Sequence, residues 1–256
     1  MNNNPLISII TPAYNSELYI LSMINSVISQ TYTNWELLIT DDCSNDETVS
    51  IVRTIMLNEK RIKLFTLSKN SGSAIARNNS INNSCGEFLA FCDSDDMWLE
   101  NKLETQIGFM TQNNISFSFT AYEIINHKGI PLNITVDSSQ FGFFKYSDML
   151  KKKATLGCCT VMLKKETFQD LLVMPNIRTG QDYAFWLKLL KNSDQNAHIL
   201  PKILSKYRIS PNSISRNKFK KAKRQFLIYR HIEKINLVSS LYYFCFYLFR
   251  AVFRKS

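Results

Sequence analysis

The sequence predicts an α/β protein built on a mainly parallel sheet with helices on both faces. Short apolar runs alternate with segments of helical periodicity over the first half of the chain, and this alternation is typical of parallel strands joined by crossover helices. Two of the apolar runs also end in acidic loops. Ligands of open parallel sheets bind beyond the carboxyl ends of the strands, so these acids lie where a ligand is expected.

Each element of the first half follows from its local pattern. The predicted strands are apolar runs bounded by polar or turn-forming residues, and the predicted helices carry apolar residues three or four positions apart. The expected strands are Leu6–Ile10, Trp35–Thr40, Arg61–Phe65 and Glu87–Cys92. The expected helices are the segment from Leu18 to Ile28, the segment from Val49 to Ile55, Ala74–Asn83 and Leu99–Met110.

The second half is less regular. Ile115–Ile125 and Ile130–Val136 flank His127-Lys128-Gly129, a pattern that predicts an antiparallel hairpin. Cys158–Leu163 is a further strand candidate, and Tyr183–Leu190 is predicted to be a helix.

The chain carries a net charge of +10 that is unevenly distributed. From Lys202 to the end there are 14 basic residues and one acid, which gives +13, so the first 201 residues carry −3. The basic tail therefore favours an anionic partner such as a membrane surface or nucleic acid. The six cysteines form no CxxC pair and have no histidine cluster beside them, so we expect no zinc site and a reduced, cytosolic chain without a signal peptide.

Asp93, Asp95 and Asp96 follow a predicted strand within four positions of one another. Carboxylates this close repel one another unless a cation or solvent relieves the repulsion. Hard divalent ions such as Mg²⁺ and Mn²⁺ bind carboxylate oxygens and leave positions open for substrate phosphates. The pattern therefore favours a metal–diphosphate site, and the alternative is a solvated acidic turn. Asp96 is the residue most suited to a structural role, as a cap of the helix expected near Trp98.

Other polar residues each have a functional and a structural interpretation. Asp42 ends a strand and either hydrogen-bonds a nucleotide or forms a turn or helix cap. Gly72 and Arg77 lie in a loop and helix start that could receive a phosphate, but no GxGxxG or GxxxxGK[ST] motif supports a dinucleotide fold or a P-loop. Asp182 opens an apolar helix, where it acts either as a general base or as an N-terminal charge that favours the helix dipole.

Five short motifs occur in order along the chain. They are Ser8-Ile9-Ile10-Thr11-Pro12-Ala13-Tyr14-Asn15, Asp41-Asp42-Cys43-Ser44-Asn45-Asp46, Asn70-Ser71-Gly72 with Ala76-Arg77-Asn78, Asp93-Ser94-Asp95-Asp96, and Gln181-Asp182 before Phe185-Trp186. Together they resemble the family 2 glycosyltransferases of the GT-A fold, from about Ile7 to Leu190. One departure is Cys43, which stands where the acidic loop of the family usually has glycine. This departure does not touch a side chain expected to bind the donor.

The resemblance implies a binding site for a nucleotide-activated sugar. Pro12, Ala13 and Tyr14 would line the nucleotide pocket. Asp42 would hydrogen-bond a uracil-type base, and Arg77 would lie near the nucleotide.

The resemblance also implies the chemistry. Asp93 and Asp95 would hold Mn²⁺ or Mg²⁺ against the diphosphate of a UDP-sugar, with Asp93 also contributing to donor binding. Asp182 would deprotonate the acceptor hydroxyl for a single inverting displacement, so that an α-linked donor gives a β-glycoside. The single base parallels that of inverting glycosidases, with a sugar hydroxyl in place of water.

The implied fold is a Rossmann-like nucleotide-sugar-binding half at residues 1–112 and a mixed acceptor half at 113–205. Residues 206–256 would form a basic, amphipathic helical tail. Within it, Leu237–Phe249 is apolar and aromatic over 13 residues, short of the ~20 that span a bilayer. We expect an interfacial helix on the anionic inner face of the cell membrane, the alternative being a helix that packs on the core.

A membrane-docked enzyme fits an acceptor carried on a polyprenyl diphosphate. By analogy with short bacterial members of the family, we expect transfer of glucose or galactose to GlcNAc- or GalNAc-diphosphoundecaprenol in O-antigen or capsule assembly.

Three competing hypotheses are weaker. A nucleotidyltransferase usually has a Gly-rich basic loop after its first strand, where this chain has Thr11-Pro12-Ala13-Tyr14-Asn15. A nucleic-acid binder would not need the apolar Leu237–Phe249 run, so we expect no nucleic-acid partner. A binding-only member of the family would not need Asp42, Asp93, Asp95 and Asp182 intact.

Overall fold

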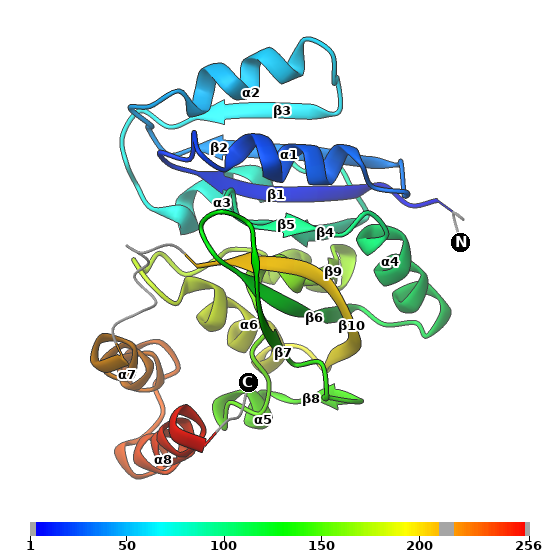
Figure 1. Ribbon diagram of the computed structural model, residues 1–256. Coiled ribbons are helices and arrows are strands. Elements are labelled where there is room, and N and C mark those ends of the chain that lie inside the picture. Colours follow the sequence, from blue (N-terminus) through cyan, green and yellow to red (C-terminus); the bar gives the residue numbers. More distant parts are fainter. Residues whose placement is uncertain (1–3, 210–217, 254–256) are drawn as a thin grey trace.

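The computed structural model describes residues 4–209 and 218–253, and these form a mixed sheet flanked by helices (Figure 1). The strand order is β3-β2-β1-β4-β9-β6-β10-β5, with β7 paired to β6 and β8 paired to β10. The predicted α/β class and GT-A architecture are confirmed by this sheet and by the structural comparisons below.

The first half alternates strand and helix as predicted. β1 pairs in parallel with β2 on one side and with β4 on the other, and β2 pairs in parallel with β3. The elements are β1 (Ile7–Ala13), α1 (Ile20–Ile28), β2 (Trp35–Asp41), α2 (Thr48–Met56), β3 (Ile62–Thr66), α3 (Ser73–Asn82) and β4 (Phe88–Phe91).

The second half adds antiparallel strands to the same sheet. The predicted hairpin is present as β6 and β7, and the predicted helix after Gly180 is α6. The elements are β5 (Met97–Trp98), α4 (Lys102–Gln112), β6 (Phe117–Ile125), β7 (Pro131–Val136), β8 (Phe143–Phe144), α5 (Tyr146–Leu150), the 3₁₀ helix η1 (Cys158–Thr160), β9 (Met162–Lys164), the 3₁₀ helix η2 (Glu166–Leu171), α6 (Gln181–Lys191) and β10 (Ala197–Arg208).

One expectation for the second half was wrong, and one strand was not predicted. The strand expected over Cys158–Leu163 begins only at Met162, because Cys158–Thr160 forms a 3₁₀ turn in which the Thr160 N–H donates to the Gly157 carbonyl. The sequence analysis also missed β10, which pairs in parallel with β6. β10 ends at Arg208 and so crosses the boundary expected at residue 205.

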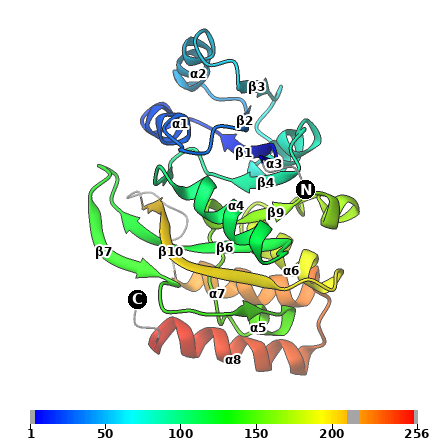
Figure 2. The same cartoon turned by 90° about the vertical axis from the view of Figure 1, so that its right-hand side faces the viewer.

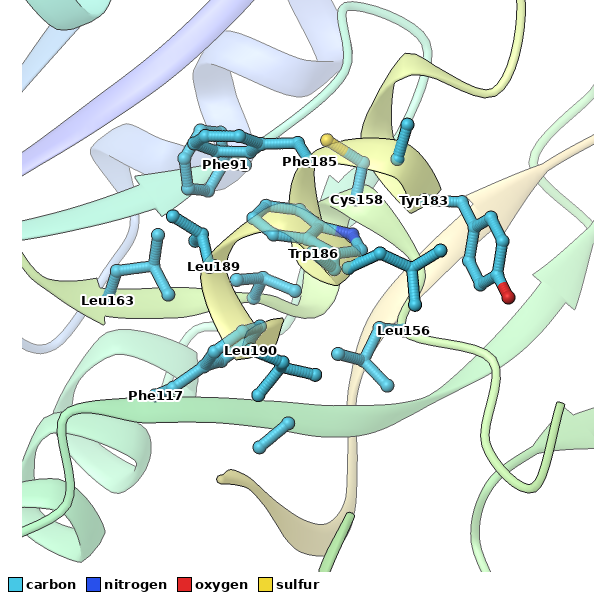
Figure 3. Close-up of a cluster of buried hydrophobic side chains, with 14 of the residues drawn as sticks. Phe91, Phe117, Leu156, Cys158, Leu163, Tyr183, Phe185, Trp186, Leu189 and Leu190 are labelled. Atoms are coloured by element: carbon cyan, nitrogen blue, oxygen red, sulfur yellow. The ribbon is translucent and has the colours of Figure 1, made fainter. Parts of the chain in front are cut away.

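The core lies on both faces of the sheet. Consecutive strand residues point to opposite faces, so Ile10 belongs to one buried cluster while Ile9 belongs to the other. This arrangement explains why β1, β2 and β4 read as continuous apolar runs. Figure 3 shows the cluster around α6, in which Trp186 lies among Phe91, Phe117 and Leu190.

The C-terminal helices are α7 (Lys218–Leu227), a π-helical turn η4 (Ile228–Ile232) and α8 (Leu237–Phe253). They lie at the opposite end of the molecule from α2 and β3 (Figures 1 and 2). Tyr229 is fully buried and donates to the Leu150 carbonyl at 2.6 Å, while Phe226 packs edge-on against Phe244. This end of the chain is therefore packed on the core.

One face of α8 remains exposed. Its apolar side chains recur at helical spacing along the side turned away from the core. They are Leu237, Val238, Leu241, Tyr242, Leu248 and Phe249, and we call them the α8 stripe. Within the described part of the chain, no helix has the length and apolar character needed to cross a bilayer.

Candidate active site

The predicted site residues gather at one edge of the sheet. β1, β2 and β4 are parallel neighbours, so the ends of β1 at Pro12 and Ala13 lie beside the acidic loops that follow β2 and β4 (Figure 1). Asp42 begins the first of these loops and Asp93 belongs to the second. Tyr14 follows β1 and is 46% exposed.

Asp42 hydrogen-bonds to two other segments at this edge of the sheet. Its backbone N–H donates to the Ala13 carbonyl at 2.8 Å, and its carboxylate accepts from the backbone N–H groups of Ser71 and Gly72, both at 2.7 Å. Gly72 has φ +94°, a conformation that favours glycine. The buried Asp42 side chain therefore fixes the loop that leads into α3.

Cys43 follows Asp42 with φ +66°. This left-handed conformation explains why glycine is the usual residue at this point of the motif. The structure accommodates Cys43 there with Ser44 donating to both oxygens of Asp41, so the departure from the motif does not disrupt the turn.

Arg77 connects the acidic loop to α3. Its side chain is 5% exposed and forms an ion pair with Asp93. Burial disfavours the charged guanidinium, but the nearby carboxylates of Asp93 and Asp182 outweigh this effect and raise the pKa of Arg77. The sequence analysis expected Arg77 near the nucleotide; the structure gives it Asp93 as its partner.

Asp95 and Asp96 differ in their surroundings. Burial, together with the negative charge of Asp93, raises the pKa of Asp95 to about 6. Asp96 is buried, and one of its oxygens accepts from the backbone N–H of Arg208 at 2.8 Å. Asp96 is structural as expected, but it anchors β10 and does not cap a helix, because the two residues after it form the short strand β5.

Arg208 supports the acidic loop from behind. Its Nε donates to the Asp95 carbonyl at 2.7 Å, and its Nη1 donates to the His127 carbonyl at 3.1 Å. One side chain thus links the acidic loop that follows β4 to the β6–β7 hairpin.

The two carboxylates Asp93 and Asp95 fit a divalent cation. Their crowding is relieved by a positive ion, and oxygen ligands suit Mg²⁺ and Mn²⁺. No group of three or more histidine, cysteine or acidic side chains in residues 4–209 and 218–253 could hold a metal alone. The arrangement therefore fits an ion that takes its remaining ligands from a diphosphate and water. Asp93 is already paired with Arg77, which leaves Asp95 as the more direct ligand.

Asp182 lies across a cavity from Asp93. It is the second residue of α6, after Gly180 in a left-handed conformation with φ +77°. Both aspartates line one cavity of about 810 Å³. This placement is compatible with a base that faces the donor site.

Aromatic packing holds the two aspartates at a fixed separation. Phe91 ends β4 just before Asp93, and it packs edge-on against Phe185 and Trp186 of α6, with centroid distances of 6.4 and 5.3 Å (Figure 3). Truncating a buried aromatic residue of this kind typically costs about 3–5 kcal/mol. The core therefore positions the strand and the helix that carry the candidate metal ligand and base.

The sequence analysis missed two groups of residues at the site. No sequence pattern around Arg208 indicates its role, because that role depends on the pairing of β10 with β6. Lys221 and Arg224 of α7 also line the cavity. The sequence feature that could have identified them is the basic run Lys218–Arg224, which we had interpreted as part of a membrane-binding tail.

Comparisons with known proteins agree with the resemblance seen in the motifs. The model of the family described as "Glycosyl transferase family 2" matches residues 8–172. TuaG of Bacillus subtilis, named as a teichuronic acid biosynthesis glycosyltransferase, is 40% identical over 254 residues, 99% of each chain. WfgD of Escherichia coli, named as a UDP-Glc:α-D-GlcNAc-diphosphoundecaprenol β-1,3-glucosyltransferase, is 41% identical over 243 residues, covering 95% of this chain and 92% of the relative.

Solved structures share the fold at low identity. The S. aureus TarS 1–349 complex with UDP-GlcNAc gives a TM-score of 0.72 at 21% identity, covering 94% of this chain and 71% of that one. The mannosyltransferase PcManGT from Pyrobaculum calidifontis, solved with GDP-Man and Mn²⁺, gives 0.64 at 17% identity, covering 88% and 62%. With the family model matching more than half of the chain, the motif-based identification is confirmed: the protein is a family 2 glycosyltransferase of the GT-A fold.

Proposed function

We propose that the protein is an inverting hexosyltransferase that moves glucose or galactose from a UDP-sugar to a lipid-linked GlcNAc- or GalNAc-diphosphate. The observation that carries the chemistry is the single cavity lined by Asp93 and Asp182 from opposing elements. The relatives favour the substrate class, because WfgD and WfaP are both named as UDP-Glc:α-D-GlcNAc-diphosphoundecaprenol β-1,3-glucosyltransferases. The product belongs to surface-polysaccharide assembly, and the relative TuaG is named for teichuronic acid biosynthesis.

The donor half binds the UDP-sugar in this proposal. Pro12, Ala13 and Tyr14 line the nucleotide pocket beside Asp42. Each Asp42 oxygen accepts one backbone N–H and retains a lone pair for the N–H of a uracil base. Arg77 holds Asp93 in place beside the diphosphate.

Asp93 and Asp95 together hold Mn²⁺ or Mg²⁺ against the donor diphosphate. A divalent ion bound there supplies Lewis-acid stabilisation of the charge on the departing UDP. Burial, and after it the negative charge of Asp93, raises the pKa of Asp95, and a bound cation would favour its charged form.

Asp182 acts as the general base. It accepts the proton of the acceptor hydroxyl while the acceptor oxygen bonds to the anomeric carbon and the bond from that carbon to the UDP oxygen breaks. The attack is in line with the leaving group, so one displacement inverts the configuration and an α-linked donor gives a β-glycoside.

The α8 stripe supports peripheral binding to the cytoplasmic face of the cell membrane. Exposed apolar and aromatic side chains on a helix next to a basic segment suit an interface that contains anionic lipid. An enzyme docked in this way meets its lipid-linked acceptor at the membrane surface.

A donor screen tests the proposal. Purified protein, Mn²⁺ and a synthetic GlcNAc-diphospho-lipid are incubated with each common UDP-sugar, with and without EDTA. We expect one EDTA-sensitive β-linked product with UDP-glucose or UDP-galactose. A product made equally well in EDTA would refute the metal assignment. If the protein forms no product and also binds no UDP, the proposed function is refuted.

Two variants assign the roles of the carboxylates. Asp95→Ala is expected to abolish transfer and to weaken metal-dependent UDP binding. Asp182→Asn is expected to keep UDP binding within about twofold while kcat falls by about 10²- to 10⁴-fold, the usual contribution of general-base catalysis. Normal turnover by Asp182→Asn would place the base elsewhere.

A further inference from the structure

The cavity beside the candidate base extends to the C-terminal helices. Besides Asp93 and Asp182, it is lined by Lys221 and Arg224 of α7 and by Tyr247 and Arg250 of α8. In both views α7 and α8 lie at the same end of the protein (Figures 1 and 2). The same cavity thus connects the catalytic edge of the sheet to the helix that carries the α8 stripe.

Four cationic side chains belong to the lining of this cavity. They are those of Lys152, Lys221, Arg224 and Arg250. Within the described ranges, neither Lys221 nor Arg224 has a carboxylate within ion-pair distance. Burial and the charge of Arg224 lower the pKa of Lys221. Cations crowded in a cavity without acidic partners favour an anionic ligand.

An uncharged side chain that can donate hydrogen bonds, that of Gln225, also lines this cavity. Gln225 is 5% exposed, and its side chain interacts with the hydroxyl groups of Tyr183 and Tyr229. An amide that lines a cavity can also donate to an oxygen atom of a ligand bound there.

Arg224 lies against the start of α6. A Cβ placed on Gly180 would lie 3.2 Å from the Arg224 Cδ and 3.3 Å from its Nε, closer than ordinary contact. The absence of a side chain at Gly180 therefore lets the guanidinium stem cross the backbone two residues before Asp182. A ligand held by Arg224 is consequently a close neighbour of the candidate base.

We propose that Lys221, Arg224, Lys152 and Arg250 form a subsite for the diphosphate of the acceptor substrate. The proposal rests on the proposed function, in which the acceptor is a sugar linked to a lipid diphosphate. The sugar hydroxyl lies at Asp182, the diphosphate lies on the cations, and the lipid leaves toward α8. Guanidinium and ammonium groups bind phosphate oxygens through charge-assisted hydrogen bonds, with arginine able to bind two oxygens at once.

The α8 residues that line the same cavity favour the acceptor diphosphate over the donor diphosphate as the ligand of these cations. The donor diphosphate is assigned to Asp93 and Asp95 at the end of β4, whereas Lys221 and Arg224 belong to α7. The α8 residues Tyr247 and Leu248 line the same cavity, which gives the first carbons of a lipid chain an apolar wall.

Kinetics of matched variants test the subsite. Arg224→Gln and Lys221→Gln remove one charge each from the cavity, and Lys223→Gln removes one charge from the exposed side of the same helix. Each full-length variant is assayed with a GlcNAc-diphospho-lipid and with the corresponding GlcNAc alkyl glycoside, which lacks phosphate. UDP affinity is measured by calorimetry in the presence of Mn²⁺.

We expect Arg224→Gln and Lys221→Gln to lower kcat/KM for the diphospho-lipid by about 10- to 100-fold, the loss expected from a charged hydrogen bond. Activity on the alkyl glycoside, UDP affinity and the Lys223→Gln control should change by less than about twofold. An equal loss on both acceptors would indicate a structural role and overturn the proposal. An equal loss of UDP affinity would assign the cations to the donor and also overturn it.

The wild-type protein separates this inference from the proposed function. If it transfers a hexose to the diphospho-lipid and to the alkyl glycoside with equal kcat/KM, the proposed function stands and the subsite is refuted. If it binds UDP but transfers to neither acceptor, the acceptor class in the proposed function is refuted and the subsite with it.

Discussion

Arg208 hydrogen-bonds to two neighbouring residues of the candidate metal site and to the β6–β7 hairpin. Its side chain donates to the backbone of Asp95, and its backbone donates to Asp96. We expect Arg208→Lys to lower kcat/KM by about 10- to 100-fold, because lysine lacks the planar set of donors that reaches two loops at once. The metal concentration needed for half-maximal activity should rise in parallel.

Metal titrations of activity and calorimetry with UDP measure this effect. The matched control is Arg53→Lys, the same change on the exposed surface of α2. An unchanged metal requirement in Arg208→Lys would show that the backbone contact to Asp95 does not position the carboxylate.

The difference between Asp93 and Arg208 shows how far single residues are predictable. Asp93 and Asp182 stand in short motifs next to strongly patterned elements, and parallel strand order alone places Asp93 at the ligand-binding edge. Arg208 and Arg224 stand in a basic stretch with many similar residues. Their positions beside Asp95 and Gly180 depend on contacts between segments far apart in the chain, which local pattern does not encode.

Lys102 is the first residue of α4, and its burial lowers the free energy of unfolding of the protein. Its side chain is 0% exposed, and its Nζ has no hydrogen-bond partner in the part of the chain described. Burial lowers the pKa of Lys102 to about 7. The unfolded chain has the ordinary lysine pKa near 10.4. Between these two values the unfolded state binds a proton that the folded state does not, so the free energy of unfolding falls as pH decreases from about 10 to 7.

We therefore expect Lys102→Met to stabilise the protein at pH 7 by about 2–4 kcal/mol. The gain should shrink at pH 9.5, where the unfolded lysine is also losing its proton. Urea unfolding at both pH values measures the difference, and Lys60→Met on the exposed surface is the control. The Nζ lies 3.8 Å from the Trp98 ring centroid. A loss of stability at pH 7 would mean that this contact holds a charged lysine.

Strands with a strong hydrophobic pattern in the sequence were predicted correctly, whereas a strand with a weak pattern was not. β1, β2 and β4 are buried on both faces and read as apolar runs, so sequence periodicity finds them. β10 alternates buried and partly exposed residues irregularly and contains Pro201, with register shifts where it pairs with β6. Its strand conformation comes from pairing with β6 and not from its own pattern.

The whole molecule has an acidic to neutral body and a basic end, and we propose two roles for the basic end. α7 lines the cavity, while the α8 stripe is exposed, and Leu248 of the stripe also lines the cavity. Tyr243 and Phe244 of α8 also pack on the core, so deleting the residues after Asn236 should both release the protein from membranes and destabilise it. Substitutions confined to the stripe separate these effects.

The double variant Val238→Glu, Leu241→Glu tests membrane binding without disturbing the core. Both side chains are exposed, at 79% and 49%, so the thermal midpoint should stay within a few degrees of wild type. Replacing apolar groups that enter the interface with charges should weaken binding to vesicles containing anionic phospholipid by roughly tenfold or more. Flotation on a density gradient measures this loss, with Leu57→Glu, 71% exposed after α2, as the control. If the double variant floats with the vesicles as wild type does, another surface holds the membrane and the stripe has a different partner.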